Sequence, residues 1–245
     1  MKIIKYLLIL PVFCVSLFGQ AEIKDPLFTE VWGPVPAVVT PGEGSNPPSD
    51  AFVLFDGKDL SLWIGDNDKE PAWDINNGVL TVKPGTGGIR TRQAFGDCQL
   101  HIEWKTPAKV KGEGQGRGNS GIFFMGQYEI QILDNYNNRT YSNGQAGSVY
   151  KDHAPLVNAC KAPDEWQSYD IVFTAPKFDE DGTLLKEARF TVFHSGILIH
   201  NNVKVMGMTA FIGLHSYTPH LDRLPLGLQD HGNLVSFRNI WIREL

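Results

Sequence analysis

The chain has 245 residues, of which 42% are hydrophobic and 20% are charged, and its formal net charge is −5 at pH 7. This length allows one large domain or two small ones, and the composition excludes a mainly disordered chain. The negative charge gives no general attraction for nucleic acid or an anionic membrane.

Residues 1–21 have the pattern of an export signal. Two lysines precede an apolar run from Tyr6 to Phe18, and small residues follow it. The run is too short to span a bilayer comfortably, so we expect cleavage near residues 19–21 and no membrane span. A lipid anchor on Cys14 is the alternative, although the sequence LPVFC lacks the small residues typical of such a site. The expected location is periplasmic, extracellular or at the cell surface.

Residues 22–49 are rich in Pro and Gly and have no hydrophobic period, which indicates an extended arm or a linker. They either complete a groove on the domain or only tether it. The folded domain is expected over residues 50–245. Two cysteines, Cys98 and Cys160, remain after cleavage, and the sequence leaves their pairing open.

Strand patterns recur along the domain, and no stretch keeps a helical period for about ten residues. Asn77-Gly78 favours a tight hairpin turn, since both residues tolerate positive φ. Half-buried alternation predicts an all-β fold of two antiparallel sheets packed face to face, a sandwich or jelly roll. The expected strands are, in chain order, AFVLF, the hairpin WDINNGVLTV, QLHIEWK, SGIFFMG, YEIQILD, SYDIVFT, ARFTVFHSGILIHN, AFIGLH, PLGLQDHG and VSFRNIWIREL.

The strand YEIQILD carries unusually many polar groups. Glu129 and Gln131 share one face, and a one-residue bulge near residues 132–133 would bring Asp134 onto that face. The row then resembles the Glu-x-Asp-x-x-Glu strand of laminarinase- and lichenase-type glycoside hydrolases. The Cα atoms of its two acids would lie roughly 13–16 Å apart, whereas a retaining pair needs carboxyls about 5–5.5 Å apart. A double displacement is therefore not established, and a solvated outer strand face is the alternative.

A glycine-rich loop, GEGQGRGNSGIFF, precedes this strand. No GK[ST] follows it, so it is not a phosphate loop, and Arg117 and Asn119 are its polar groups with reach. A turn-rich segment after the strand supplies further polar groups, namely Gln145, Tyr150, Lys151, Asp152 and His153.

The segment HSYTPHLDRLPLGLQDHGN adds histidines. Alternation places Gln229 and His231 on one face, with Asp230 on the other, and His220 precedes them on a loop. Histidine is suited to proton transfer near neutral pH, but each of these could equally be a structural or surface residue. No spacing matches a known zinc or calcium motif, and no G-x-S-x-G is present.

The segments FVLFDGKDLSLW, GNSGIFFMGQYEIQILDNY, GQAGSVY, EWQSYDIVFTAP and PLGLQDHGNLVSFRNIWIREL together resemble the 3-keto-disaccharide hydrolases, a family formerly described as a domain of unknown function. The resemblance covers nearly all of residues 50–245. It implies a concanavalin A-like jelly roll that cleaves glycosides after a partner oxidoreductase has oxidised the sugar at C3. A C3 ketone acidifies the C2 proton, so a base can remove it and the glycosidic oxygen at C1 can leave.

Carried onto this sequence, the resemblance implies three catalytic residues, Glu129, Asp134 and His231, with His231 as the partner of Glu129 across the sheet. Substrate binding is expected from Arg117, Asn119, His153, His220, Gln131, Gln229 and Asp230. Arg117 would stabilise the developing negative charge, and a divalent metal at the His and carboxylate groups is an open alternative. The rival functions are a non-catalytic carbohydrate-binding module, a conventional glycoside hydrolase and an adhesive surface domain.

Overall fold

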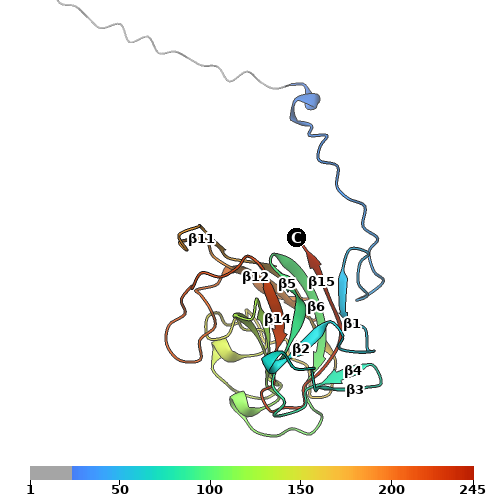
Figure 1. Ribbon diagram of the computed structural model, residues 1–245, viewed down its shortest axis with the longest axis vertical. Helices are drawn as coiled ribbons and strands as arrows, with labels where there is room; N and C mark the ends of the chain where they lie inside the picture. Colours follow the sequence, from blue (N-terminus) through green and yellow to red (C-terminus); the bar gives the residue numbers. More distant parts are fainter. Residues whose placement is uncertain (1–23) are drawn as a thin grey trace, which may run out of the picture. The chain divides into compact units, whose positions relative to one another are not determined.

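The computed structural model describes residues 24–245 (Figure 1). The expected export signal, its cleavage site and Cys14 lie outside the described residues. The chain divides at residue 38 into an N-terminal part and a compact unit, Val39–Leu245. The described N-terminal part contains one 3-10 helix, η1 (Pro26–Thr29), whose first turn is capped by the Asp25 side chain.

The compact unit is built almost entirely of strands. These are β1 (Phe52–Phe55), β2 (Trp63–Gly65), β3 (Asp74–Asn76), β4 (Val79–Thr81), β5 (Ile89–Phe95), β6 (Cys98–Lys105), β7 (Ser120–Phe124), β8 (Tyr128–Ile132), β9 (Gln167–Thr174), β10 (Lys177–Phe178), β11 (Leu184–Lys186), β12 (Arg189–His194), β13 (Ile197–Lys204), β14 (Leu224–Leu228) and β15 (Ser236–Glu244). Short 3-10 helices are η2 (Asp66–Asp68), η3 (Gly114–Gly116) and η4 (Ser142–Gly144).

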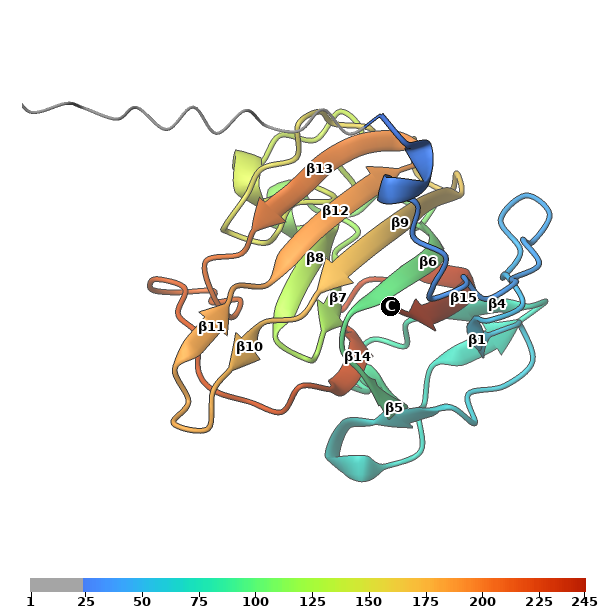
Figure 2. The same cartoon turned by 90° about the horizontal axis from the view of Figure 1, so that it is seen from above.

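Apart from the two-stranded pair β10-β11, the strands form two antiparallel sheets, which confirms the all-β sandwich. The larger has the order β13-β12-β9-β6-β15-β4-β3 with β1 also paired to β15, and the smaller has the order β2-β5-β14-β7-β8. Figure 2 shows β13, β12, β9 and β6 side by side in one curved layer, with β8, β7 and β14 behind it.

The core lies between the sheets and follows from the alternation in the sequence. Leu100, Ile102 and Trp104 of β6 are fully buried, as are Ile122 of β7 and Ile130 of β8. Burying each such side chain contributes about 1.5–3 kcal/mol. Because inner-face residues alternate with outer-face ones, the core of the smaller sheet fixes which side chains of β8 point outward.

Several strand expectations differ from the structure, and the expected strand PLGLQDHG ends at Leu228. The segment AFIGLH is a loop, in which Phe211, Ile212 and Leu214 are exposed, because no neighbouring strand pairs with it. Conversely, strands β2, β5, β10 and β11 were not expected, and in β5 the buried position between Arg90 and Arg92 is the polar Thr91, which hides the apolar alternation. The hairpin turn at Asn77-Gly78 is present, with positive φ at both residues. Within residues 24–245, Cys98 and Cys160 form no disulfide.

The segment before β1 is part of the compact unit from Val39 onward. The Ser45 hydroxyl donates to Glu103, and the Ser45 carbonyl accepts from the indole of Trp241, each at 2.9 Å. These contacts lie on β6 and β15 of the larger sheet, away from the outer face of β8.

Candidate active site

The β7–β8 hairpin presents Glu129 and Gln131. Its turn has positive φ at Met125 and Gly126, which lets the chain reverse tightly. The pairing of β7 with β8 keeps one register along its whole length, so the bulge expected near residues 132–133 is absent. The strand ends at Ile132. Glu129 and Gln131 therefore share the face opposite the core, and the strand does not carry Asp134 beside them.

The Glu129 side chain is buried and has no partner. The residue is 4% exposed, and no group among the described residues donates a hydrogen bond to its carboxylate. Loss of hydration on burial raises the pKa of Glu129 to about 8. A carboxyl with this pKa is largely protonated at neutral pH and can exchange a proton near it, as a general acid or base requires.

Gly121 makes the room for this carboxyl. A Cβ atom at this position would lie 2.4 Å from Oε1 of Glu129 and 2.9 Å from the ring of Phe123. Both contacts are shorter than van der Waals separation, so any other residue here must displace the acid. The glycine of SGIFF thus has a positioning role for a side chain on the next strand.

The loop that contains η3 supports an amide network beside Glu129. The side chain of Gln131 donates to Oε1 of Gln115 at 2.9 Å, and Asn119 donates to the Gln115 carbonyl at 2.7 Å. Gln115 in turn donates to the carbonyl of Gly144 at 2.7 Å. The amide oxygens of Gln131 and Asn119 are buried and receive no hydrogen bond from the described residues. Two fixed acceptors are therefore available to donors such as sugar hydroxyls.

The end of β14 supplies the other wall. The backbone N–H of Gln229 donates to the Gly121 carbonyl at 3.0 Å, which continues the sheet beyond the strand. Gln229 and Gln131 consequently flank β7 at the same level. Gln229 also has a buried amide oxygen without a partner among the described residues. His231 lies two residues further on and is exposed at the mouth.

These walls enclose a cavity of about 600 Å³, which we call the Glu129 cavity. Its volume lies in the usual range for small-molecule sites, about 300–1,000 Å³. The residues that line it are Gln115, Gly116, Asn119, Phe123, Glu129, Gln131, Tyr150, Thr209, Phe211, Gln229 and His231. Five of the ten residues expected from the sequence thus meet in one place: Glu129, His231, Asn119, Gln131 and Gln229.

Arg117 and Asp134 lie together in a neighbouring cavity. Nε of Arg117 contacts a carboxylate oxygen of Asp134 at 2.7 Å, and the two side chains are 14% and 3% exposed. Arg117 also donates to the carbonyl of Tyr136 at 3.0 Å. The guanidinium is thereby committed to a buried ion pair and does not line the Glu129 cavity.

Asp230 fastens a turn rather than lining the cavity. Its carboxylate accepts the N–H groups of Gly85, Thr86 and Gly87, at 2.7, 3.1 and 3.2 Å, and that of Gly232 at 2.8 Å. The alternation expected from the sequence is preserved, because Asp230 points away from its neighbours Gln229 and His231.

Two expected histidines also have partners outside the cavity. His153 bonds the Lys204 carbonyl through Nε2 at 2.5 Å. His220 donates from Nδ1 to the Leu221 carbonyl, which leaves Nε2 to accept from the Tyr128 hydroxyl at 2.8 Å. Both histidines are therefore bonded within the protein and do not line the Glu129 cavity.

Loop residues complete the cavity, and few of them were predictable from the sequence. Thr209 accepts the N–H of Glu129 at 2.9 Å and so fixes the loop after β13 against β8. Lys151 donates to the Phe211 carbonyl, and its amine lies 4.1 Å from the centre of the Phe211 ring. Tyr150 bonds the Tyr141 hydroxyl at 2.7 Å. Of the lining aromatic residues, only Tyr150 stood out in sequence, as part of the turn-rich segment.

Comparison with known proteins identifies the family. The 3-keto-alpha-glucoside-1,2-lyase-like domain matches residues 50–243. The chain belongs to this family. A 3-keto-disaccharide hydrolase from Bacteroides thetaiotaomicron is 27% identical over 240 residues, which cover 80% of this chain and 79% of that relative. These findings support a carbohydrate-active role of the glycoside hydrolase type.

Solved structures agree with the family fold. A candidate glycosyl hydrolase from Parabacteroides distasonis is 48% identical, with a TM-score of 0.87 over 90% of this chain and 97% of that one. A second candidate glycosyl hydrolase from the same organism has a TM-score of 0.60 at 19% identity, over 80% of this chain and 94% of that one, and shows the fold alone.

Metal-binding clusters and membrane-spanning helices are both absent from the described residues. Residues 24–245 include no cluster of three or more His, Cys, Asp or Glu side chains placed to hold a metal ion. Within the same residues, no helix has the length and apolar character needed to cross a membrane.

Gly121→Ala is expected to lower turnover by about 10- to 100-fold, since a displacement of about 1 Å at a reacting group has an effect of this size. The added methyl group must move the Glu129 carboxyl, while the β7 backbone stays in place. Steady-state kinetics with the substrate described below measures the effect. The matched control is Gly227→Ala on the adjacent β14, where a Cβ would meet its nearest atom at an ordinary 3.5 Å. Equal losses in both variants would contradict a specific clash with Glu129.

Proposed function

We propose that this chain is an exported enzyme that cleaves glycosides whose sugar is oxidised at C3. The observation that carries the proposal is the buried Glu129 carboxyl, with its raised pKa, in a cavity that also contains His231 and three unpaired amide oxygens. Family membership supports the substrate class. Export is supported by the sequence of residues 1–21 alone.

The proposed chemistry begins at C2. His231, as the base, removes the C2 proton, and the electron pair of that bond forms an enolate with the C3 ketone. The enolate collapses to restore the ketone, a C1=C2 double bond forms, and the C1–O bond breaks. Glu129, protonated below its pKa of about 8, donates its proton to the departing oxygen.

Addition of water gives net hydrolysis and resets both groups. The Glu129 carboxylate takes a proton from the water that attacks C1, and His231 returns its proton to C2. If the unsaturated sugar leaves first, the same residues act as a lyase. Neither outcome requires the closely spaced carboxylate pair of a retaining glycosidase.

The remaining polar groups orient the sugar and support the enolate. The amide oxygens of Asn119, Gln131 and Gln229 accept from sugar hydroxyls, since each is buried without another donor. The Tyr150 hydroxyl is held by Tyr141 and can donate to the C3 oxygen. Burial raises the pKa of Tyr150, so its proton is retained at neutral pH.

The experiment compares 4-nitrophenyl 3-keto-glucosides with the unoxidised glucosides, as both anomers and with and without a chelator. Release of nitrophenol from the keto substrates alone is expected. Release from the unoxidised glucosides at a similar rate would indicate a conventional glycosidase. Binding of either sugar without release would indicate a carbohydrate-binding module, in which Phe211 serves as the stacking surface because Trp63, Trp73 and Trp104 are in the core. A loss of turnover with chelator would reveal a metal.

His231→Ala is expected to lower the turnover of the keto substrate by at least about a hundredfold, as for loss of a general base. The unfolding midpoint should hardly change, since the side chain is exposed. His215→Ala, a histidine outside the Glu129 cavity, is the control. Unchanged turnover in His231→Ala would remove the residue from the proposed mechanism.

A further inference from the structure

A second cavity adjoins the Glu129 cavity and has a different character. Its volume is about 420 Å³, and Gly116 lines both cavities. His231 belongs to the first, while Gly232, Asn233 and Leu234 line the second, so the two cavities also meet along this segment. A ligand that extends from the Glu129 cavity past Gly116 would enter the second one. We call it the lysine cavity.

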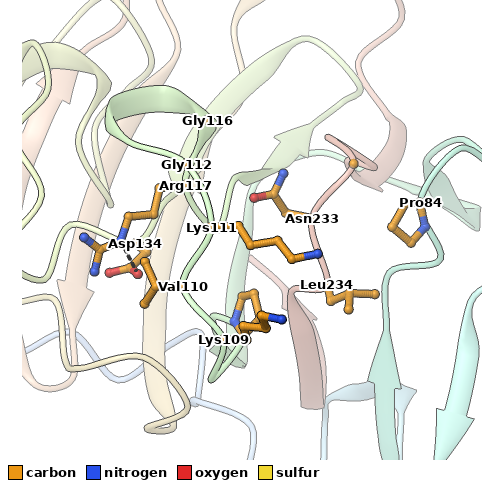
Figure 3. A pocket seen from close by; sticks show the side chains of 13 residues that line it. Pro84, Lys109, Val110, Lys111, Gly112, Gly116, Arg117, Asp134, Asn233 and Leu234 are labelled. Carbon is orange, nitrogen blue, oxygen red and sulfur yellow. Dashed lines mark hydrogen bonds and ion pairs between the residues drawn. The ribbon is translucent and has the colours of Figure 1, made fainter.

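The lysine cavity carries a net positive charge. Among its lining residues the cations are Lys109, Lys111 and Arg117, and the one acid is Asp134. Arg117 neutralises Asp134 at 2.7 Å, which leaves two positive charges uncompensated within the lining. Figure 3 shows Arg117 directed to Asp134, with Lys109 and Lys111 nearer to Asn233 and Leu234.

The two lysines have no structural task among the described residues. Neither ammonium group makes a hydrogen bond or an ion pair there, whereas Lys105, on the strand just before them, contacts Asp164. Both lysines are exposed, and their chain of carbons reaches the cavity. Their charge is therefore available to a ligand.

We propose that the lysine cavity is a subsite for a negatively charged group on the unit attached to the sugar that is cleaved. The chemical class is an acidic glycoside, whose leaving unit bears a carboxylate or a sulfate. Lys109 and Lys111 bind the oxyanion, and the Asn233 side chain lies beside it. Because the two cavities adjoin, a unit attached to a sugar ring in the Glu129 cavity can extend to these charges. This inference deepens the proposed function and rests on it for the identity of the cleaved sugar.

Maltobionate and maltitol form a matched ligand pair, since they differ only in a carboxylate against a hydroxymethyl group, and cellobionate and cellobiitol provide the other anomer. Neither carries a keto group, so both report binding without turnover. Calorimetry with the full chain should show the acid of one pair binding about tenfold more tightly than its neutral partner. The preference should shrink at about 1 M salt, where the screening length is about 3 Å. Inorganic sulfate should compete if the subsite also accepts a sulfate group.

The variants are Lys109→Gln with Lys111→Gln, and Lys109→Glu with Lys111→Glu. The double Gln variant should abolish the preference for the acid and leave the affinity for the alditol unchanged. The double Glu variant should reverse the preference. Lys186→Gln, an exposed lysine on β11, is the control. Thermal unfolding verifies that all variants fold.

Equal affinity for acid and alditol, a preference that survives both double variants, or no measurable binding of either bionate would overturn the subsite. The two proposals fail separately. Turnover of neutral keto-glucosides without an acid preference refutes the subsite alone, whereas an acid preference that depends on the lysines, without turnover, refutes the proposed function alone.

Discussion

Glu129→Gln is expected to lower turnover of a 3-keto-glucoside by about a hundredfold or more, because the amide can neither donate nor accept the transferred proton. The wild-type rate should also fall as pH rises through about 8, the pKa of Glu129, since the protonated acid is lost. Rate measurements across this pH range verify both effects. The matched control is Glu180→Gln, an exposed acid on a loop.

The same substitution should stabilise the fold at alkaline pH. The folded-state pKa of about 8 lies above the ordinary value of 4.5, so the folded chain binds the proton more tightly than the unfolded chain. The contribution of the protonated acid is complete below about pH 4.5 and is lost as pH rises toward 8, by on the order of a few kcal/mol. Gln cannot ionise and avoids this loss.

Urea unfolding of wild type and Glu129→Gln near pH 5 and above pH 8 measures the difference. The variant should be the more stable at the higher pH and nearly equal at the lower one. A variant that is less stable than wild type at both pH values would show that the Glu129 carboxylate has a stabilising partner after all.

Arg117→Ala is expected to destabilise the fold by about 3–5 kcal/mol, as observed when one partner of a buried ion pair is removed. The substitution leaves the Asp134 carboxylate, 3% exposed, without its counter-charge. Urea unfolding at neutral pH measures the loss. Asp134→Asn in the same background should recover part of it, because the amide is neutral and can still accept from the N–H of Tyr136.

Arg90→Ala is the matched control for this prediction. Arg90 pairs with Asp68, but the side chains are 44% and 75% exposed, so the expected cost is below about 1 kcal/mol. If Arg117→Ala were no more destabilising than Arg90→Ala and yet abolished turnover, Arg117 would act on the substrate, as its place in the glycine-rich loop first indicated.

The sandwich was predictable because its signal is local. Alternation in β6 separates Leu100, Ile102 and Trp104 from the polar residues between them, and the structure buries all three in the core. Sequence reasoning failed where the hydrophobic pattern of a segment disagrees with the strand pairing in the fold. The apolar residues of AFIGLH lie exposed on a loop that no neighbouring strand extends. His101 alternates with the apolar residues of β6, yet it is buried against Trp241 and bonds Asp170 at 2.6 Å.

The candidate site was predictable where its residues lie on a strand or directly continue one. Parity places Glu129 with Gln131 on the outward face of β8, and the same parity, continued past the end of β14 at Leu228, places Gln229 with His231. The position of Asp134 depends on where β8 ends, and that is set by packing. Loop residues have no period, so no pattern indicated Thr209 or Phe211. Gln115 lies in the glycine-rich loop but was not singled out from the sequence, and its hydrogen bond with Gln131 shows its place in the site.

The hydrogen bonds to the Asp230 carboxylate make one side of the Glu129 cavity more firmly held than the other. Residues 85–87 belong to the crossing from β4 of the larger sheet to β5 of the smaller one, so their three hydrogen bonds tie the His231 segment to both layers. On the opposite side, Thr209 is tied to the β7–β8 hairpin by two hydrogen bonds, one with the N–H of Glu129 and one with the Gln127 carbonyl, whereas Phe211 beyond it is held by the Lys151 side chain. The width of the Glu129 cavity is therefore fixed on the Asp230 side and adjustable on the Phe211 side. Ligands of different bulk would be accommodated by the Phe211 loop, without altering the base or the acid.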